Sequence, residues 1–366
     1  MWFKIAKDTL ERLINRVVPV IPSRTPYPII QNILCFTEKG KLTLLATDLD
    51  IYVKTFSEIE SKEDARVLLP GRKLAGIVKE SSSEEIEFVK EENRVTLKAG
   101  RSTFRIPILD PDEFPRMFEC PSDVKFNLES GELKNLFEAV EFAVSKGEDR
   151  PAMTGVLWEI NSEHNRMVAT DGHRMALSDE KGNIPQISEQ SRILPTKIFT
   201  FMPKDYEGSV DIFVDDAKIG LSFEATEIVS RLIEGPYPDY QKVIPKEINN
   251  ILTVNREEFT SALRRMMIFS NQVTRQIKLE LGKKNLKLFS TSPEGEEAQE
   301  ELGCTYKGEA FEVAYNGAYL LDILRHLESE DIVFEITGAL SAALIRSGGD
   351  RANQARLYLL MPILLD

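Results

Sequence analysis

The sequence predicts an α+β protein in which three similar domains follow one another along the chain. Three observations lead to this prediction. A short segment recurs three times, its apolar spacing changes from a strand pattern to a helix pattern within each copy, and later strands are separated by short turns. Short turns favour antiparallel sheet with the helices on one face. A chain of 366 residues is long enough for two or three domains, each with its own core.

The repeat begins near the amino terminus. Residues 3–14, 126–137 and 252–263 align without gaps at offsets of 123 and 126 residues, and their apolar positions coincide. In the first copy Phe3 and Ile5 alternate with polar residues, as in a half-buried strand, whereas the later apolar residues recur at helical spacing. One such strand–helix pair would be ordinary, but three in phase indicate an internal repeat.

The remainder of each copy follows the same plan. Each is expected to contain a strand that ends in a turn, at 41–48, 165–171 and 285–291. A second helix is expected at 71–79, 195–202 and 317–327, and two alternating strands close each copy, at 94–97 with 103–108, 219–223 with 228–233, and 343–346 with 356–361. Proline and charge cluster around 110–123 and 235–249, so the predicted domains are residues 1–121, 122–247 and 248–366.

Composition limits the class of protein. A hydrophobic content of 42% with 29% charged residues is ordinary for a soluble globular protein. The first residues lack the pattern of a signal peptide, and no apolar run approaches the roughly 20 residues that span a bilayer. Cys35, Cys120 and Cys304 are odd in number and far apart, which argues against a disulfide framework or a structural zinc site. We therefore expect a cytoplasmic protein with no membrane partner, metal or cofactor.

The charge is unevenly distributed. The net charge of −13 argues against a surface that binds nucleic acid everywhere. The six predicted helical segments with their flanks nevertheless sum to +8, which leaves −21 for the rest of the chain. A positive helical face could neutralise phosphates without reading bases. Solvated lysines and arginines would give the same count, so charge alone leaves both interpretations open.

Residues 169–176, Ala-Thr-Asp-Gly-His-Arg-Met-Ala, gather polar groups between two apolar runs. Asp171 and His173 could form an acid–base pair, and Asp48 with Asp50 could bind a metal ion. Nucleophilic catalysis also needs a nucleophile and oxyanion donors, however, and the sequence has no strong nucleophile motif. Aspartate at the end of a strand commonly forms a turn. We therefore expect no catalytic activity.

The same three residues, Ala-Thr-Asp, also occur at 46–48 in the first repeat, where they continue as Leu-Asp-Ile. This recurrence indicates that Ala-Thr-Asp is architectural, a strand end and turn that both copies need. The functional part of the segment then narrows to residues 172–175, which only the middle copy has.

The repeats, the positive helical face and three segments together resemble the bacterial DNA sliding clamp, the beta subunit of DNA polymerase III. The most specific segments are residues 169–176, Arg-Leu-Ile-Glu-Gly-Pro-Tyr-Pro-Asp-Tyr at 231–240 and Tyr-Leu-Leu-Met-Pro at 358–362. The resemblance spans the whole chain. It implies three clamp-type domains in tandem, with antiparallel sheets outside and helices inside, in a ring-shaped head-to-tail homodimer.

The resemblance also implies a function. Double-stranded DNA would thread the ring without sequence recognition. The ring would tether the replicative polymerase catalytic subunit, the clamp loader, and other clamp-binding polymerases and repair proteins, each through a short apolar peptide. A repeat scaffold that binds protein but not DNA is the alternative.

Site residues follow from the resemblance. It implies a peptide-binding groove formed by Met153, Thr170, Gly172, His173, Arg174, Met175, Pro238, Lys242, Val243, Leu359, Leu360, Met361, Pro362 and Ile363. It implies DNA contacts by Arg24, Arg72, Lys73, Lys146, Arg150 and Lys197. Lys242 and Leu364 depart from the family pattern, because many family members carry arginine where this chain has Lys242 and a basic residue where it has Leu364. The loop at 147–149 is acidic here, which does not suit a DNA contact.

Overall fold

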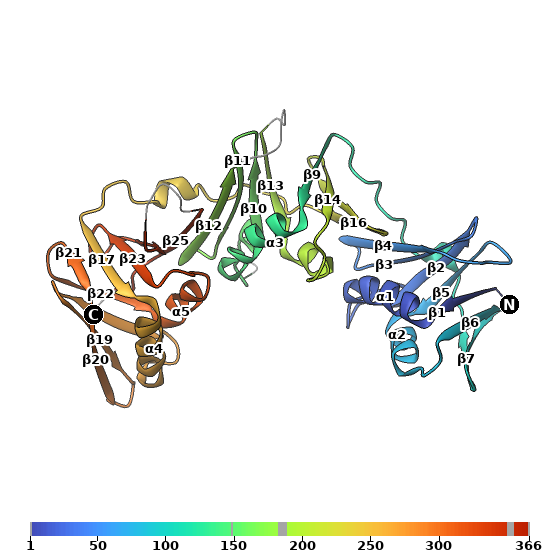
Figure 1. The fold of residues 1–366 in the computed structure, drawn as a ribbon, viewed down its shortest axis with the longest axis horizontal. Coiled ribbons are helices and arrows are strands. Elements are labelled where there is room, and N and C mark those ends of the chain that lie inside the picture. The colour runs from blue at the N-terminus through green and yellow to red at the C-terminus, as the bar shows by residue number, and fades with distance from the viewer. Residues whose placement is uncertain (1, 148, 182–188, 350–354, 365–366) are drawn as a thin grey trace. The chain divides into compact units, whose positions relative to one another are not determined.

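A computed structural model describes residues 2–147, 149–181, 189–349 and 355–364 (Figure 1). The chain forms two compact units, of which unit 1 is Met1–Lys134 with Leu194–Ile233, and unit 2 is Asn135–Ile193 with Glu234–Asp366. The registers of the described strand pairs are antiparallel in both units. The predicted α+β class with antiparallel sheets is therefore confirmed.

Unit 1 contains an eight-stranded sheet in the order β5-β2-β3-β4-β16-β15-β14-β9 and a four-stranded sheet in the order β1-β6-β7-β8. Its strands are β1 (Phe3–Ala6), β2 (Asn32–Glu38), β3 (Lys41–Thr47), β4 (Ile51–Glu58), β5 (Ala65–Pro70), β6 (Glu85–Lys90), β7 (Arg94–Ala99), β8 (Ser102–Pro107), β9 (Val124–Glu129), β14 (Ser209–Val214), β15 (Lys218–Phe223) and β16 (Thr226–Arg231). Helix α1 (Lys7–Val17) packs against β3, β4 and helix α2 (Gly71–Glu80).

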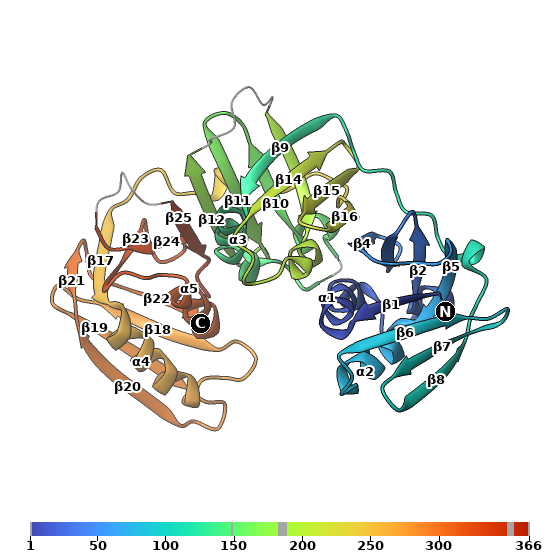
Figure 2. The same ribbon diagram turned by 45° about the vertical axis from the view of Figure 1, so that its right-hand side comes forward.

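Unit 2 contains a nine-stranded sheet in the order β13-β10-β11-β12-β25-β24-β23-β17-β21 and a four-stranded sheet in the order β20-β19-β18-β22 (Figure 2). Its strands are β10 (Gly155–Ile160), β11 (His164–Thr170), β12 (Arg174–Lys181), β13 (Gln190–Pro195), β17 (Asn250–Asn255), β18 (Gln276–Leu281), β19 (Asn285–Thr291), β20 (Glu297–Gly303), β21 (Thr305–Lys307), β22 (Phe311–Asn316), β23 (Asp331–Ile336), β24 (Ala343–Ser347) and β25 (Arg356–Leu360). Helix α4 (Arg256–Met266) packs against β19, β20 and helix α5 (Gly317–Arg325). The chain passes between the units at three places: within helix α3 (Ser130–Glu138), within strand β13, and between Ile233 and Glu234 after β16.

Local sequence explains where the helices begin and end. The buried residues of α1 (Leu10, Leu13, Ile14 and Val17) form one apolar stripe. In α4 the side chain of Asn255 accepts hydrogen bonds from the amides of Glu257 and Glu258, both at 3.1 Å. Asn316 caps α5 in the same way. Each cap satisfies amides that have no partner within the helix, which stabilises it by about 1 kcal/mol.

The helix predicted at 195–202 is wrong in type. This segment forms a short 3-10 helix, Thr196–Phe201, that follows the extended residue Pro195. Its sequence, Thr-Lys-Ile-Phe-Thr-Phe, is made largely of β-branched and aromatic residues, which lose side-chain freedom in an α-helix. The other five predicted helical segments all contain an α-helix.

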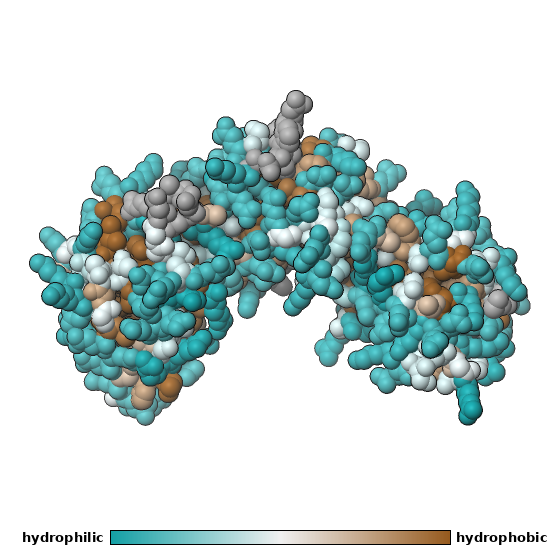
Figure 3. Space-filling view, in the orientation of Figure 1, coloured by the Kyte–Doolittle hydropathy of each residue, from teal (hydrophilic) through white to brown (hydrophobic). Residues whose placement is uncertain are grey.

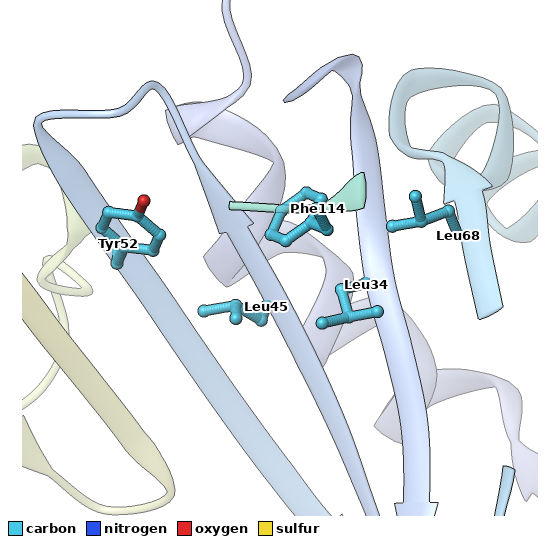
Figure 4. Packing of buried hydrophobic residues seen from close by; sticks show 5 residues of the cluster. All are labelled: Leu34, Leu45, Tyr52, Leu68 and Phe114. Carbon is cyan, nitrogen blue, oxygen red and sulfur yellow. The ribbon is translucent and has the colours of Figure 1, made fainter. Parts of the chain in front are cut away.

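The linker that follows β8 packs onto the eight-stranded sheet. Its residue Phe114 lies over the same sheet face as Leu34, Leu45 and Tyr52 (Figure 4), and all four are at most 6% exposed. Phe36, Met117 and Phe118 pack around this cluster. A buried leucine such as Leu45 contributes about 2–5 kcal/mol when compared with alanine. The linker is therefore part of the folded unit.

The exposed surface is mainly polar. On the face seen in Figure 3, hydrophilic residues predominate and hydrophobic residues form small, separate patches. Across the parts of the chain that the structure describes, helices are too short or too polar to span a bilayer.

Candidate functional site

The turn between β11 and β12 is held by its own side chains. Thr170 Oγ1 donates to the carbonyl of Arg174 at 2.7 Å and accepts from the Gly172 amide at 3.1 Å. Asp171 Oδ1 accepts from the amides of His173 and Arg174 at 2.9 and 3.0 Å. Gly172 has a φ of +88°, a left-handed conformation that glycine adopts without steric cost. The backbone of the turn is therefore fixed before any ligand arrives.

Arg174 connects this turn to its surroundings. Its side chain is 8% exposed and forms ion pairs with Asp171 at 3.1 Å and with Asp322 of α5 at 2.7 Å. Its Nη2 donates to the carbonyl of Phe142 at 2.6 Å, and its guanidinium lies 4.3 Å from the ring centre of Tyr319. A buried cation needs such partners, and the planar guanidinium can serve several at once. Arg174 thus has a positioning role in the wall of the site.

The polar residues of the two turns serve the fold. Asp171 uses one oxygen for backbone amides and the other for Arg174, while the His173 ring is exposed and stacks on Tyr319 at 6.4 Å. Asp48 Oδ1 likewise accepts from the Asp50 amide at 3.1 Å, and its Oδ2 bonds Lys197. Within the described residues no group of three or more potential metal ligands comes together. These contacts favour the architectural interpretation of both aspartates.

A hollow of about 160 Å³ lies beside the turn. The pairing of β12 with β25 places Met175 opposite Leu359, and both are at most 2% exposed, as is Met153. Met361 and Val243 are 40% and 50% exposed. The hollow is lined by Arg150, Met153, Thr170, Gly172, His173, Arg174, Met175, Pro238, Asp239, Tyr240, Val243, Leu359 and Met361. Such an apolar hollow with a few oriented polar groups suits the apolar side chains of a peptide.

One wall of the hollow comes from the linker between β16 and β17. Tyr240 begins a 3-10 turn, Tyr240–Val243, and its hydroxyl donates to Glu159 at 2.6 Å and accepts from Arg166 at 3.1 Å. Burial, reinforced by the acceptor Glu159, raises the pKa of Tyr240. The Tyr237 hydroxyl donates to the carbonyl of Val168 at 3.3 Å. Both tyrosines fasten the linker to the sheet, so Pro238 and Val243 are held beside the hollow.

Most of the predicted groove residues meet here. Met153, Thr170, Gly172, His173, Arg174, Met175, Pro238, Val243, Leu359 and Met361 all line the hollow. Lys242 does not, because its ammonium points to Asp239 at 2.8 Å and its side chain is 81% exposed. Leu360 is fully buried, since side chains alternate along β25.

The chain's last described residues also leave the hollow. The amide of Met361 donates to the His173 carbonyl at 2.9 Å, and that of Ile363 donates to Ala314 of β22 at 2.8 Å. Pro362 and Ile363 therefore lie outside the lining. Sequence reasoning missed Asp239 and Tyr240 as lining residues, although both belong to the segment that carried the resemblance.

The predicted DNA contacts in unit 1 differ in whether their charged groups already bond other groups of the protein. Arg24 and Lys73 are exposed. Arg72 donates to the carbonyl of Ile21 at 2.9 Å and to Ser23 Oγ at 3.1 Å. Lys197 forms the ion pair with Asp48 described above. A phosphate would have to compete with these partners for Arg72 and Lys197.

The predicted DNA contacts in unit 2 are Lys146 and Arg150. Lys146 is exposed, whereas Arg150 lines the hollow, with Nη1 4.0 Å from Met153 Sδ. The acidic loop at 147–149 includes Glu148, which lies outside the described residues.

Comparison with known proteins agrees with this architecture. The family descriptions of the DNA polymerase III beta subunit match in order: the N-terminal domain at residues 1–118, the central domain at 127–239 and the C-terminal domain at 241–363. A beta sliding clamp of Pseudomonas putida is 31% identical over 370 residues and covers both chains completely.

Solved structures give the same result. The DNA polymerase III subunit beta of Pseudomonas aeruginosa is 30% identical, with full coverage of both chains and a TM-score of 0.95. A sliding clamp from the same species, bound to griselimycin, is 30% identical, again with full coverage, and has a TM-score of 0.94. The predicted resemblance and the three tandem clamp domains are thus confirmed. The chain belongs to the DNA polymerase III beta subunit family, the beta sliding clamps, which are non-catalytic processivity factors of DNA replication.

Proposed function

We propose that this sliding clamp works as a head-to-tail homodimer that encircles duplex DNA and tethers the replicative polymerase through the hollow of unit 2. Its place of action would be the cytoplasm, where its free cysteines stay reduced. The proposed domains remain residues 1–121, 122–247 and 248–366, with both limits between strands. The observation that carries the proposal is the pattern of strand pairing, which repeats within the chain and leaves two complementary edges.

The repeat indicates how two copies would join. Strand β16 pairs with β4 in unit 1, and β25 pairs with β12 in unit 2. Each copy of the repeat contains a run of four neighbouring strands: β1-β6-β7-β8, β9-β14-β15-β16 and β17-β23-β24-β25. The last strands of these runs, β8, β16 and β25, therefore correspond to one another. Strand β20 likewise corresponds to β4 and β12. Each of these strands pairs with the strand just before it in its copy: β4 with β3, β12 with β11 and β20 with β19. β8 and β20 are edge strands of their sheets, so β8 of one protomer would pair with β20 of its partner.

The charges on these edges support that pairing. Tyr52 pairs with Val229 and Met175 pairs with Leu359 at the two internal junctions. The equivalent residues on the free edges are Glu297 of β20 and Arg105 of β8, both exposed. Oppositely charged residues directly across two strands attract each other. An exposed edge also invites pairing with another strand.

DNA would be held by cations that do not read sequence. Arg24, Arg72, Lys73, Lys146, Arg150 and Lys197 are the proposed phosphate contacts. Arg24, Lys73 and Lys146 are the strongest candidates because they are exposed, whereas Arg72 and Lys197 already bond groups within unit 1 and Arg150 stands at the peptide hollow. Non-specific phosphate contacts permit sliding, since no position along the duplex is favoured.

The hollow of unit 2 would receive one short apolar peptide from each partner. The proposed partners are the replicative polymerase catalytic subunit, the clamp loader, and other clamp-binding polymerases and repair proteins. The proposed groove comprises Met153, Thr170, Gly172, His173, Arg174, Met175, Pro238, Lys242, Val243, Leu359, Leu360, Met361, Pro362 and Ile363. Methionines at the walls adapt to differing anchors. Tethering then raises the local concentration of the polymerase at the primer end.

The test compares retention on DNA of two topologies. Clamps loaded onto circular duplex DNA should stay bound and should be released after a single cut that linearises it. Equal release from circular and linear DNA would contradict encirclement.

For the hollow, a labelled peptide that copies the polymerase tail should lose affinity when Met175 is changed to Glu. The matched control is Lys246→Glu, at an exposed residue of the same linker that belongs neither to the proposed groove nor to the lining of the hollow. Griselimycin should compete with the peptide.

A further inference from the structure

Unit 1 contains a second turn built like the one beside the peptide hollow. Thr47 Oγ1 donates to the carbonyl of Ile51 at 2.8 Å and accepts from the Leu49 amide at 2.8 Å. Asp48 Oδ1 accepts from the amides of Asp50 and Ile51 at 3.1 and 2.8 Å. These four bonds match, atom for atom, those of residues 170–174. Leu49 even has the same φ as Gly172, +88°.

The surroundings of the two turns also correspond. The 3-10 helix Pro28–Gln31 of unit 1 is the counterpart of Pro151–Thr154 in unit 2, and both begin with a proline that follows an irregular residue. The residue before the proline is Tyr27 in unit 1, which is 58% exposed, and Arg150 in unit 2. Both units therefore present a turn, a 3-10 helix and a two-strand junction in the same order.

The junction places equivalent side chains at equivalent points. In unit 1, β4 and β16 set Tyr52 opposite Val229, as β12 and β25 set Met175 opposite Leu359. Arg231 follows β16 residue Ser230 at the point where Met361 follows Leu360 in unit 2. The backbone frame of the peptide hollow thus occurs twice in the chain.

The frame in unit 1 is occupied by a side chain of the same chain. The Phe118 ring packs edge-on against Tyr52, with centroids 4.7 Å apart, and the Arg231 guanidinium lies 5.0 Å from its centre. Phe118 is half-buried and packs against the apolar cluster around Phe114. An aromatic ring between an aromatic neighbour and a cation is favourably placed on both sides.

We propose that unit 1 carries a second peptide-binding groove, of the same construction as that of unit 2, and that the chain closes it with its own Phe118. The linker after β8 is the counterpart of the linker that forms one wall of the unit 2 hollow, and in unit 1 its residue Phe118 also fills the space that a peptide would take. Phe118 lies four residues after Phe114, which is 5% exposed and anchored in the core. The short tether keeps the local concentration of Phe118 high, so a free peptide competes poorly.

The proposal rests on the proposed function of the unit 2 hollow, because the peptide class is inferred from it. Removal of the Phe118 side chain should open the second groove to an apolar peptide. Arg231 and Asp50, 4.0 Å apart and both exposed, would flank the opening, where unit 2 has Met361 and His173. The second groove should therefore accept a polar residue next to the apolar anchor more readily than the first does.

Isothermal titration of the full-length protein with the polymerase-tail peptide tests this inference. The expected stoichiometry is one peptide per chain for the wild type and two for Phe118→Ala, with the second site weaker by about tenfold. Phe118→Leu should still bind one peptide per chain, because leucine also fills the space between the two strands. The control Leu109→Ala removes another linker side chain, which is 48% exposed, and this variant should also bind one peptide per chain.

A peptide carrying a photo-crosslinker locates the gained site. In Phe118→Ala it should label Tyr27 or Leu49, and labelling confined to unit 2 would overturn the inference. A stoichiometry of one in a natively folded Phe118→Ala protein would overturn it as well. If that variant unfolds, Phe118→Val replaces it under the same criteria. If the wild type binds no peptide, the proposed groove of unit 2 fails. A peptide bound only after Phe118→Ala would still support the second groove, and none bound would overturn both.

Discussion

Reversal of one charge on the free edge of unit 1 should weaken the proposed homodimer. Arg105 of β8 would face Glu297 of the partner's β20, as deduced from the registers of the internal junctions. A similar cross-strand ion pair exists within unit 1, where Lys54 and Glu227 lie 2.7 Å apart across β4 and β16. Exchanging an attractive pair for a repulsive one shifts a cross-strand interaction by about 1 kcal/mol.

A head-to-tail dimer contains this interface twice, so Arg105→Glu should destabilise it by roughly 2 kcal/mol, or about 30-fold in the dissociation constant. Sedimentation equilibrium measures that constant. The double variant Arg105→Glu with Glu297→Arg should recover most of the loss. Lys98→Glu, a reversal on the interior strand β7, is the matched control and should leave the constant unchanged. An unchanged constant for Arg105→Glu, or no recovery in the double variant, would refute the predicted register.

Three further variants test the turn, the DNA contacts and the wall of the hollow. Gly172→Ala places a side chain at φ +88°, which costs roughly 1–2 kcal/mol, so amide hydrogen exchange in the turn should accelerate; unchanged exchange would contradict this. Lys73→Ala should lower the slope of log DNA affinity against log salt by about 1, whereas Lys98→Ala should not, and equal slopes would remove Lys73 from the phosphate contacts. Asp322→Asn weakens the ion pair that positions Arg174, so polymerase-tail peptide affinity measured by fluorescence anisotropy should fall about fivefold, for a loss of roughly 1 kcal/mol; retained affinity would leave Arg174 without a positioning role.

The parts of the fold that depend on local pattern could be predicted from the sequence. Alternation and helical spacing, repeated three times, gave the strands and most helices because burial of an apolar face decides them. The Ala-Thr-Asp turn was also accessible, since both copies share it and aspartate bonds its neighbouring amides. The groove residues at 170–175 and 359–361 followed from the resemblance, and the pairing of β12 with β25 explains why they meet.

The remainder depends on contacts between distant segments. Lys197, a proposed DNA contact, also pairs with Asp48 of a different repeat, and spacing gives no sign of that partner. Arg150, another proposed DNA contact, lines the hollow together with Met153 of the 3-10 helix that follows it, and spacing gives no sign of this either. Leu49 has a left-handed backbone that leucine rarely adopts, so only the shared hydrogen bonds of the turn account for it.

The continuity of the large sheets has a consequence for how the protein can be divided. The central family domain, residues 127–239, contributes strands to both compact units. The boundaries of the family domain therefore differ from the boundaries of the compact units. A fragment that stops at residue 118 would leave the edge of β4 without β16, its antiparallel neighbour. Such an edge promotes aggregation. During synthesis more than 160 residues are added after β4 before β16 is made. Until then the sheet of the first domain lacks the strand that pairs with β4.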